Sequence, residues 1–187
     1  MLEIKTLTTI SEAQYVRLIA DSGYTSTEKY AVSKQESVER TLIALDLVAL
    51  DKPYVKRWGR DDELEDEVYP KALVQGLSLG AYLGGELVGV AITEKREWNE
   101  TLWLWEFHVD AARRGQGIGR QLMQVLELRA RTAGLRVIAL ETQNTNVPAI
   151  RFYRAMGFEI EGIDLSLYSN ADVEDGEVAL FMKKKLE

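Results

Sequence analysis

The 187-residue chain contains no cysteine and a single histidine, His108. The absence of cysteine excludes disulfides, thiolate metal sites and an acyl-enzyme formed through sulfur. One histidine without any cysteine also argues against a catalytic zinc site, so we expect no metal. No apolar run reaches the roughly 18 residues of a membrane span, because the longest candidate, 42–50, is interrupted by Asp46.

Acidic residues outnumber basic ones. The net charge is −7, and contacts to phosphate backbones need clustered Lys and Arg, so we expect no nucleic-acid partner. The residues that follow Met1 lack an apolar signal core, which predicts a cytoplasmic protein without a membrane partner. With 46% hydrophobic residues, we expect 1–187 to form a single domain with a substantial core. The negative balance suits a cationic substrate, and it equally suits simple solubility.

The most informative stretch is a predicted strand, a glycine-rich turn and a predicted helix. An apolar run over 102–109 precedes the turn, and apolar side chains recur with a helical period over 118–133. Three glycines, Gly115, Gly117 and Gly119, leave backbone N–H groups of the turn accessible to a ligand. Because the first turn of a helix carries unpaired N–H groups and partial positive charge, this stretch predicts a phosphate or pyrophosphate site.

Three phosphate-binding patterns compete for this turn. A Walker-type loop ends in Gly-Lys-Ser/Thr, whereas Gly119 is followed by Arg120 and Gln121, which offer no hydroxyl for magnesium. A dinucleotide fingerprint needs a glycine where Arg120 stands, although Glu141 lies near the ribose-binding spacing of about 20 residues, so this interpretation stays open. The third pattern, Arg/Gln-x-x-Gly-x-Gly/Ala, is met by residues 114–119.

This third pattern resembles the turn that holds the pyrophosphate of coenzyme A in the GNAT superfamily of acyl-CoA-dependent N-acyltransferases. A second segment, 146–158, resembles the family's Asn-x-x-Ala-x-x-Phe-Tyr-x-x-x-Gly-Phe motif and follows at the usual distance. The resemblance covers about 102–168. Within the superfamily, Leu-Glu-Thr-Gln at 140–143 and Gly-Ile-Asp-Leu at 162–165 are similar to the streptothricin (nourseothricin) acetyltransferase branch.

The resemblance implies a fold and a cosubstrate. The implied fold is α/β (α+β), with a mixed central sheet of about seven strands flanked by about four helices and a central parallel pair splayed to admit acetyl-CoA. In that family the turn holds the pyrophosphate, and the main chain of 107–109 pairs with the pantetheine arm like an added strand. The residues so implied in cofactor binding are Phe107, His108, Val109, Arg114, Gly115, Gln116, Gly117, Ile118, Gly119, Arg120, Asn146, Ala149 and Tyr153.

The chemistry of amine acylation points to particular side chains. The reaction needs a free amine, a polarised carbonyl and a proton for the leaving thiolate. An alkyl amine has a pKa of about 10, so a carboxylate that accepts its proton increases the reactive fraction at neutral pH. Glu106, in the middle of the predicted strand, is the first candidate for this base, and Glu141 is the second. By resemblance, Tyr153 stands at the general-acid position, while His108 is expected to be structural or to line the cleft.

Structural alternatives exist for both catalytic candidates: Glu106 as a half-buried, hydrogen-bonded acid, and Tyr153 as a packing residue. Because cysteine is absent, we expect direct transfer in a ternary complex. The resemblance favours a small-molecule amine of the streptothricin type as acceptor, and a monomer or homodimer as the assembly. The residues expected to contact the acceptor are Glu141, Asp164, Tyr168 and Tyr54. The alternatives are a protein α-amine, a lysine or another small amine, and a non-catalytic CoA-binding module.

Other segments have simpler interpretations. Ser11 to Gln14 is typical of a capping box that opens a helix to about Ser22. Gly84-Gly85 is a two-residue hairpin signal, Gly134 is typical of a helix end, and Asn146 can cap the helix of the second motif. Further strands are expected at 2–8, 41–50, 77–83, 86–94, 137–140, 158–168 and 177–183, and a short helix at 70–76. Period-two alternation places Trp105 and Phe107 on one face of the central strand and Glu106 and His108 on the other. Residues 28–39 show no clear pattern, and the acidic run 61–67 is interpreted as a solvated loop or a lip that attracts substrate.

Overall fold

The computed structural model describes residues 1–61 and 64–186. A seven-stranded mixed sheet has the order β1-β4-β5-β6-β7-β9-β8, and β2 and β3 form a separate two-stranded sheet. The strands are β1 (Leu2–Thr6), β2 (Gly23–Glu36), β3 (Thr41–Arg57), β4 (Leu79–Leu83), β5 (Glu86–Arg96), β6 (Thr101–Val109), β7 (Val137–Gln143), β8 (Glu159–Asp164) and β9 (Ala179–Lys185). The α-helices are α1 (Glu12–Tyr15), α2 (Tyr69–Leu73), α3 (Ile118–Thr132), α4 (Val147–Ala155) and α5 (Asp172–Asp175). The seven-stranded mixed sheet confirms the predicted fold class.

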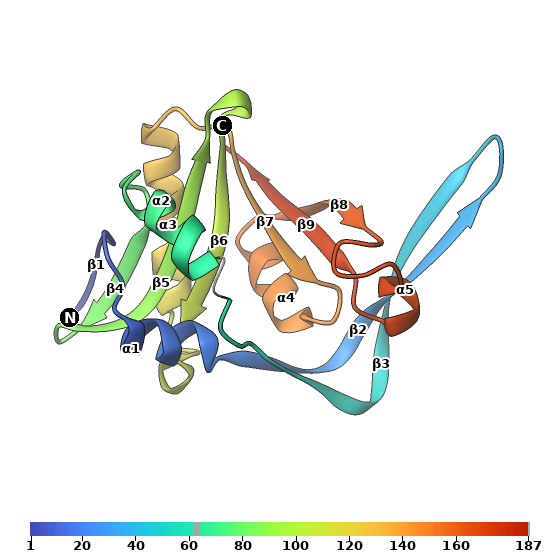
Figure 1. Cartoon of the computed structure of the whole chain (residues 1–187), viewed down its shortest axis with the longest axis horizontal. Helices are drawn as coiled ribbons and strands as arrows, with labels where there is room; N and C mark the ends of the chain where they lie inside the picture. Colours follow the sequence, from blue (N-terminus) through green and yellow to red (C-terminus); the bar gives the residue numbers. More distant parts are fainter. Residues whose placement is uncertain (62–63, 187) are drawn as a thin grey trace. The chain divides into compact units, whose positions relative to one another are not determined.

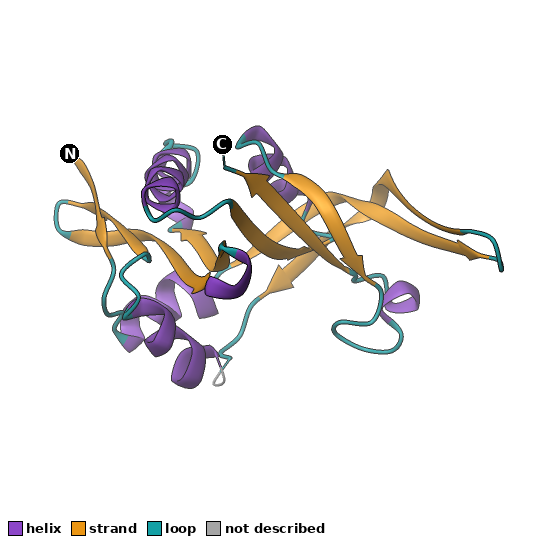
Figure 2. Ribbon diagram, turned by 90° about the horizontal axis from the view of Figure 1, so that it is seen from above, coloured by secondary structure: helices purple, strands orange, loops and turns teal. Residues whose placement is uncertain are grey.

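The chain divides into two compact units, of which the first comprises Met1–Gly23, Arg57–Leu140 and the residues from Lys184 onward. In this unit β1, β4, β5 and β6 pair antiparallel, with α3 on one face of the sheet and α1 and α2 on the other (Figures 1 and 2). The buried cluster between the sheet and the two short helices includes Leu7, Tyr15, Leu18, Ile19, Tyr69, Leu73, Leu87, Val90 and Ile92. Packing in this cluster holds α2, and therefore Tyr69, against β5. Among the described residues, no helix is both long and apolar enough to cross a membrane.

The first helix begins as the sequence predicts. The N–H of Gln14 donates to Ser11 Oγ at 3.3 Å, and the N–H of Ser11 donates to Gln14 Oε1 at 2.9 Å, so the capping box is confirmed. The helix continues as a π-helical turn over Val16–Ala20. The side chains that pack inward are Tyr15, Leu18 and Ile19.

Glycines end two elements of this unit where they were expected. Gly84 and Gly85 form the two-residue turn of the β4–β5 hairpin, in which Leu83 pairs with Glu86. Gly134 follows α3 with a φ of +71°, and its N–H donates to the carbonyl of Arg131 at 3.0 Å. The α3 side chains buried against the sheet include Ile118, Leu122, Leu126 and Ala130, which confirms most of the predicted apolar face.

The parallel pair β6–β7 is present, and its ladder is short. Residues Thr101–Leu104 of β6 pair in register with Val137–Leu140 of β7. The ladder ends at Leu104 and Leu140, although both strands continue further along the chain. This is the pair that the family resemblance predicts to splay.

The second unit comprises Tyr24–Lys56 and Glu141–Lys183, and it contains the largest departure from the sequence prediction. The strand expected at 41–50 is confirmed as part of β3, which extends to Arg57. Its partner β2 was not predicted, because its outer half is polar and lacks alternation. Together β2 and β3 form the long ribbon visible in Figure 1. The exposed large apolar side chains of the ribbon are Leu42, Ile43, Leu47, Val48 and Val55 of β3.

Two smaller expectations were wrong. β8 ends at Asp164, so Tyr168 lies in the following turn and not on a strand. The turn is held by the buried carboxylate of Asp172, which accepts hydrogen bonds from the N–H of Tyr168 at 3.0 Å and from Ser169 Oγ at 2.8 Å. In the acidic run 61–67, positions 62–63 fall outside the described residues, and Leu64–Val68 forms a π-helical turn where a loop was expected.

Candidate active site

The glycine-rich turn between β6 and α3 has the geometry of an anion-binding site. Gly115 and Gly117 have φ values of +77° and +81°, and no heavy atom of the described residues lies within 4 Å of the position a Cβ would occupy on either. The first intrahelical hydrogen bond of α3 runs from the N–H of Gln121 to the carbonyl of Gly117 at 3.1 Å. The N–H groups of residues 118–120 therefore precede the ladder and have no acceptor within the helix. Open space beside these N–H groups fits a pyrophosphate.

The arginines of the turn have different surroundings. The guanidinium of Arg114 donates to the carbonyl of Val109 at 3.2 Å and to the carbonyl of Gly23 at 3.3 Å. Arg114 therefore fixes the turn onto the main chain, which the sequence did not predict. Arg113 and Arg120 are exposed and add positive charge around the helix N-terminus.

A β-bulge interrupts β6 beside the expected thioester position. In the ladder with β5, Thr93 pairs with Leu104 and Ile92 pairs with Glu106, so Trp105 is the extra residue. The predicted strict alternation along β6 is therefore wrong at this point. Trp105 packs against the buried cluster that contains Tyr69, and Glu106 hydrogen-bonds the same Tyr69, so these adjacent residues do not lie on opposite faces.

The bulge places Glu106 in a chain of polar side chains within the first unit. Tyr69 Oη donates to Glu106 Oε1 at 2.5 Å, and His108 Nε2 lies 2.6 Å from Glu106 Oε2. On the far side of the imidazole, His108 Nδ1 lies 3.1 Å from Ser22 Oγ. The side chains of Glu106 and His108 are only 15% and 13% exposed. Both carboxylate oxygens therefore have a defined partner in a half-buried setting.

Tyr69 and Ser22 were not identified from the sequence. Burial, followed by the neighbouring carboxylate of Glu106, raises the pKa of Tyr69 well above its ordinary value, so this phenol stays protonated. A protonated Tyr69 can only donate to Glu106 Oε1. No spacing rule points to either residue, because they reach the network from α2 and from the segment before β2.

The second motif lies in the second unit, on α4. Asn146 caps this helix through its Oδ1, which accepts from the N–H of Ala149 at 3.3 Å, so the predicted cap is confirmed. Tyr153 is 8% exposed, and its ring lies 5.4 Å from that of Phe152 and 5.5 Å from that of Phe158. These contacts fix the orientation of the phenol ring.

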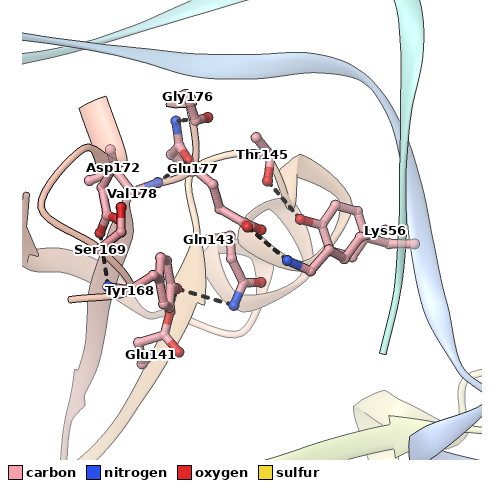
Figure 3. Close-up of polar contacts among 12 residues, drawn as sticks. Lys56, Glu141, Gln143, Thr145, Tyr168, Ser169, Asp172, Gly176, Glu177 and Val178 are labelled. Carbon is pink, nitrogen blue, oxygen red and sulfur yellow. Dashed lines mark hydrogen bonds and ion pairs between the residues drawn. The ribbon is translucent and has the colours of Figure 1, made fainter. Parts of the chain in front are cut away.

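A polar cluster gathers around the end of β7 in the same unit (Figure 3). The hydroxyl of Tyr168 donates to a carboxylate oxygen of Glu141 and accepts from Gln143 Nε2 at 3.2 Å. Lys56 Nζ donates to Glu177 Oε2 at 2.7 Å. The structure thus brings Glu141 and Tyr168 together. It adds Gln143, which appeared only as part of a family motif, and Lys56 and Glu177, which no sequence motif indicated.

Of the other two predicted acceptor contacts, Tyr54 lies near Glu177 of the same cluster, whereas Asp164 takes part in a local turn. The ring of Tyr54 is 6.1 Å from that of Tyr24, whose hydroxyl lies 2.6 Å from Thr145 Oγ1. Burial, and then the charge of Glu177, raises the pKa of Tyr54 above its ordinary value. Asp164 Oδ1 instead accepts from the N–H of Ser166 at 3.0 Å, which closes a local turn.

Comparison with known proteins agrees with this geometry. Residues 45–158 match the model of the Acetyltransferase (GNAT) family. The chain is 37% identical over 143 residues to the streptothricin acetyltransferase of Streptomyces lavendulae, covering 74% of each chain. It is 31% identical over 129 residues to the Escherichia coli streptothricin acetyltransferase, covering 69% of each. The crystal structure of nourseothricin acetyltransferase superposes with a TM-score of 0.75 at 28% identity, over 100% of this chain and 99% of that one.

A second solved structure supports the fold. It is a putative streptothricin acetyltransferase from Bacillus anthracis in complex with acetyl coenzyme A, with a TM-score of 0.72 and 24% identity. It covers 99% of both chains, including the β2–β3 ribbon. From the family match, the two relatives and the open glycine turn, we conclude that this chain belongs to the GNAT acetyltransferase family and is an acetyl-CoA-dependent N-acetyltransferase.

Proposed function

We propose that the protein acetylates a primary amine of a streptothricin-type antibiotic, by direct attack on acetyl-CoA in a ternary complex. The observation that carries this proposal is the similarity to two streptothricin acetyltransferases over more than two thirds of both chains. We further propose that it acts in the cytoplasm as a monomer or homodimer. Its partner would be a small-molecule amine, with no nucleic acid or membrane involved.

In the proposed mechanism the glycine turn binds the pyrophosphate of the cosubstrate. We assign the pyrophosphate to the N–H groups of Gly115, Gln116, Gly117 and the first turn of α3, because the space beside Gly115 and Gly117 is open. By family resemblance, the main chain of Phe107–Val109 would pair with the pantetheine amides, and Asn146 and Ala149 are proposed to contact the same arm. Support for the pairing comes from the end of the β6–β7 ladder at Leu104, since residues 107–109 are paired with β5 and not with β7.

Glu106 is the proposed general base. It accepts a proton from the ammonium form of the acceptor, directly or through water, and His108 and Tyr69 hold its two oxygens in place. Tyr153 is the proposed general acid, which protonates the departing thiolate of coenzyme A. The bond from the acetyl carbon to sulfur breaks as the bond to nitrogen forms, so no covalent acetyl-enzyme arises.

The substrate assignment is tested by measuring coenzyme A release from acetyl-CoA with a purified streptothricin as acceptor. We expect saturable turnover and intersecting initial-rate lines when both substrates are varied. Glu106→Gln should lower kcat/KM at neutral pH by about a hundredfold. If streptothricin is not acetylated but a peptide, lysine or another small amine is, the acceptor assignment is wrong, whereas the proposed acetyl transfer from acetyl-CoA to an amine is retained.

A further inference from the structure

Two buried oxygen atoms in the polar cluster of the second unit lack a hydrogen-bond partner among the described residues: Gln143 Oε1 and Glu177 Oε1. Gln143 is only 8% exposed. Glu177 uses its other oxygen, Oε2, to accept from Lys56 Nζ. A buried acceptor without a donor is destabilising, so this pair of oxygens needs an explanation.

Hydrogen bonds join the two segments that carry these side chains. The N–H of Asn144 donates to the carbonyl of Val178 at 2.9 Å, and the N–H of Val178 donates to Asn144 Oδ1 at 2.8 Å. Gln143 and Glu177 directly precede these two residues, so each lies one position from the point where the two segments are joined. Figure 3 shows Gln143 between Tyr168 on one side and the Lys56–Glu177 pair on the other.

The hydrogen-bond network also fixes which end of the Gln143 amide faces Tyr168. The hydroxyl proton of Tyr168 is used in the bond to Glu141, so toward Gln143 this hydroxyl can only accept. The group that faces Tyr168 must therefore be Nε2. The unpartnered end of Gln143 is therefore its acceptor oxygen, Oε1.

The charge of the groups around the two oxygens is negative. Three carboxylates, Glu141, Asp172 and Glu177, stand against the ammonium groups of Lys56 and of Lys29, whose Nζ lies 3.2 Å from the position a Cβ would occupy on Gly176. A phosphate or carboxylate ligand would be repelled by this excess. An alkylammonium carries three N–H donors and a positive charge, which satisfies an amide oxygen and a carboxylate oxygen together.

We propose that Gln143 Oε1 and Glu177 Oε1 bind a non-reacting ammonium group of the acceptor, so that the enzyme prefers acceptors with two or more amino groups. This inference rests on the proposed function, since it concerns the acceptor of the same reaction. Gln143 and Glu177 are then specificity residues, which affect the binding of diamines and not the chemical step.

The test compares 1,5-diaminopentane with 1-aminopentane, which share the reacting amine and chain length and differ in the second ammonium. With the full-length protein and acetyl-CoA, we expect the diamine to have a KM about tenfold lower. Glu177→Gln and Gln143→Met should each raise the KM for the diamine by about tenfold and leave the values for the monoamine unchanged. The control is Glu159→Gln, which removes one negative charge at an exposed position of β8 outside the cluster. It should change neither the KM for the diamine nor the KM for the monoamine.

Calorimetric titration of each amine into the protein keeps the inference separate from the proposed function. If no amine is acetylated, the proposed function fails, and a preference for binding the diamine that Glu177→Gln abolishes would still support the ammonium site. If acetylation proceeds and the two variants affect both amines equally or neither, the ammonium site is wrong. Circular dichroism and coenzyme A binding identify a variant that fails to fold. In that case the ammonium site is tested with the other of the two variants.

Discussion

Tyr69 Oη lies 2.5 Å from Glu106 Oε1, which joins a residue of the short helix α2 to the bulged strand β6. The ring of Tyr69 is 2% exposed and belongs to the buried cluster of the first unit, so its position is set by packing. Because burial and the neighbouring carboxylate raise its pKa, this phenol is protonated at neutral pH and can donate to Glu106. The proposed base is therefore oriented by the hydrophobic core.

Replacing this donor tests the proposed base. Tyr69→Phe keeps the ring but removes a hydrogen bond that stabilises the ionised form of Glu106. We expect kcat/KM at neutral pH to fall by about tenfold, because the proposed base loses the donor that orients it. The matched control is Tyr15→Phe in the same cluster, where Tyr15 Oη accepts from the N–H of Asp61 at 3.3 Å. Equal values of kcat/KM for the two variants would count against Glu106 as the base.

Tyr153→Phe separates catalysis from binding on α4. The substitution keeps the ring contacts with Phe152 and Phe158 and removes only the hydroxyl. We expect kcat to fall by about a hundredfold, while the dissociation constant of coenzyme A changes little. The measurements are steady-state kinetics and calorimetric titration of coenzyme A. A variant that loses coenzyme A affinity and keeps kcat would show that the hydroxyl serves in binding.

The two ends of α3 allow a controlled test of the glycine turn. Gly117 and Gly134 have φ values of +81° and +71°, and neither would place a Cβ within 4 Å of a described heavy atom. Alanine at either position should destabilise the fold by about 1 kcal/mol, because both adopt the left-handed conformation. Only Gly117→Ala should also weaken coenzyme A binding, by about tenfold, since its methyl group enters the space assigned to the pyrophosphate. Equal coenzyme A affinities in the two variants would show that the pyrophosphate does not bind at this turn.

Asp172 predicts a pH-dependent contribution to stability. Burial alone would raise its pKa, but hydrogen bonds from the main chain of Tyr168 and from the Ser169 hydroxyl outweigh burial and lower it. A depressed pKa in the folded state stabilises the protein above the unfolded value of about 3.9, and this stabilisation is lost as the pH falls through the folded value. Asp172→Asn should therefore melt at a lower temperature than the parent protein at pH 7. The difference should shrink below about pH 4, and a constant difference would contradict this role.

The sequence predicted the parts of the fold that depend on local signals. The capping box at Ser11, the hairpin turn at Gly84-Gly85 and the helix cap at Asn146 each rest on residues within a few positions of one another. The outer half of β2 is polar, and it is a strand because β3 pairs with it. No pattern within 28–39 could show this, since the information lies in the partner strand.

The candidate site likewise contains some features that follow from local sequence signals and others that depend on residues far apart in the sequence. The glycine turn and the residues of α4 follow from spacing, whereas Tyr69 reaches Glu106 across 37 positions of sequence. The bulge at Trp105 also escaped prediction, because alternation assumes an uninterrupted ladder with β5. Gln143 was visible only as part of a family motif, and its unpartnered oxygen became apparent once Tyr168 and Glu177 were placed beside it.

The ribbon of β2 and β3 has a consequence for the behaviour of the protein at high concentration. A two-stranded ribbon has two edges whose N–H and C=O groups can pair with another chain. On β3 these edges run beside exposed Leu, Ile and Val side chains, a composition that favours strand pairing between molecules. Precipitation during storage should therefore begin at this ribbon while the buried cluster around Tyr69 is still intact. Loss of protein from solution would then precede any loss of specific activity.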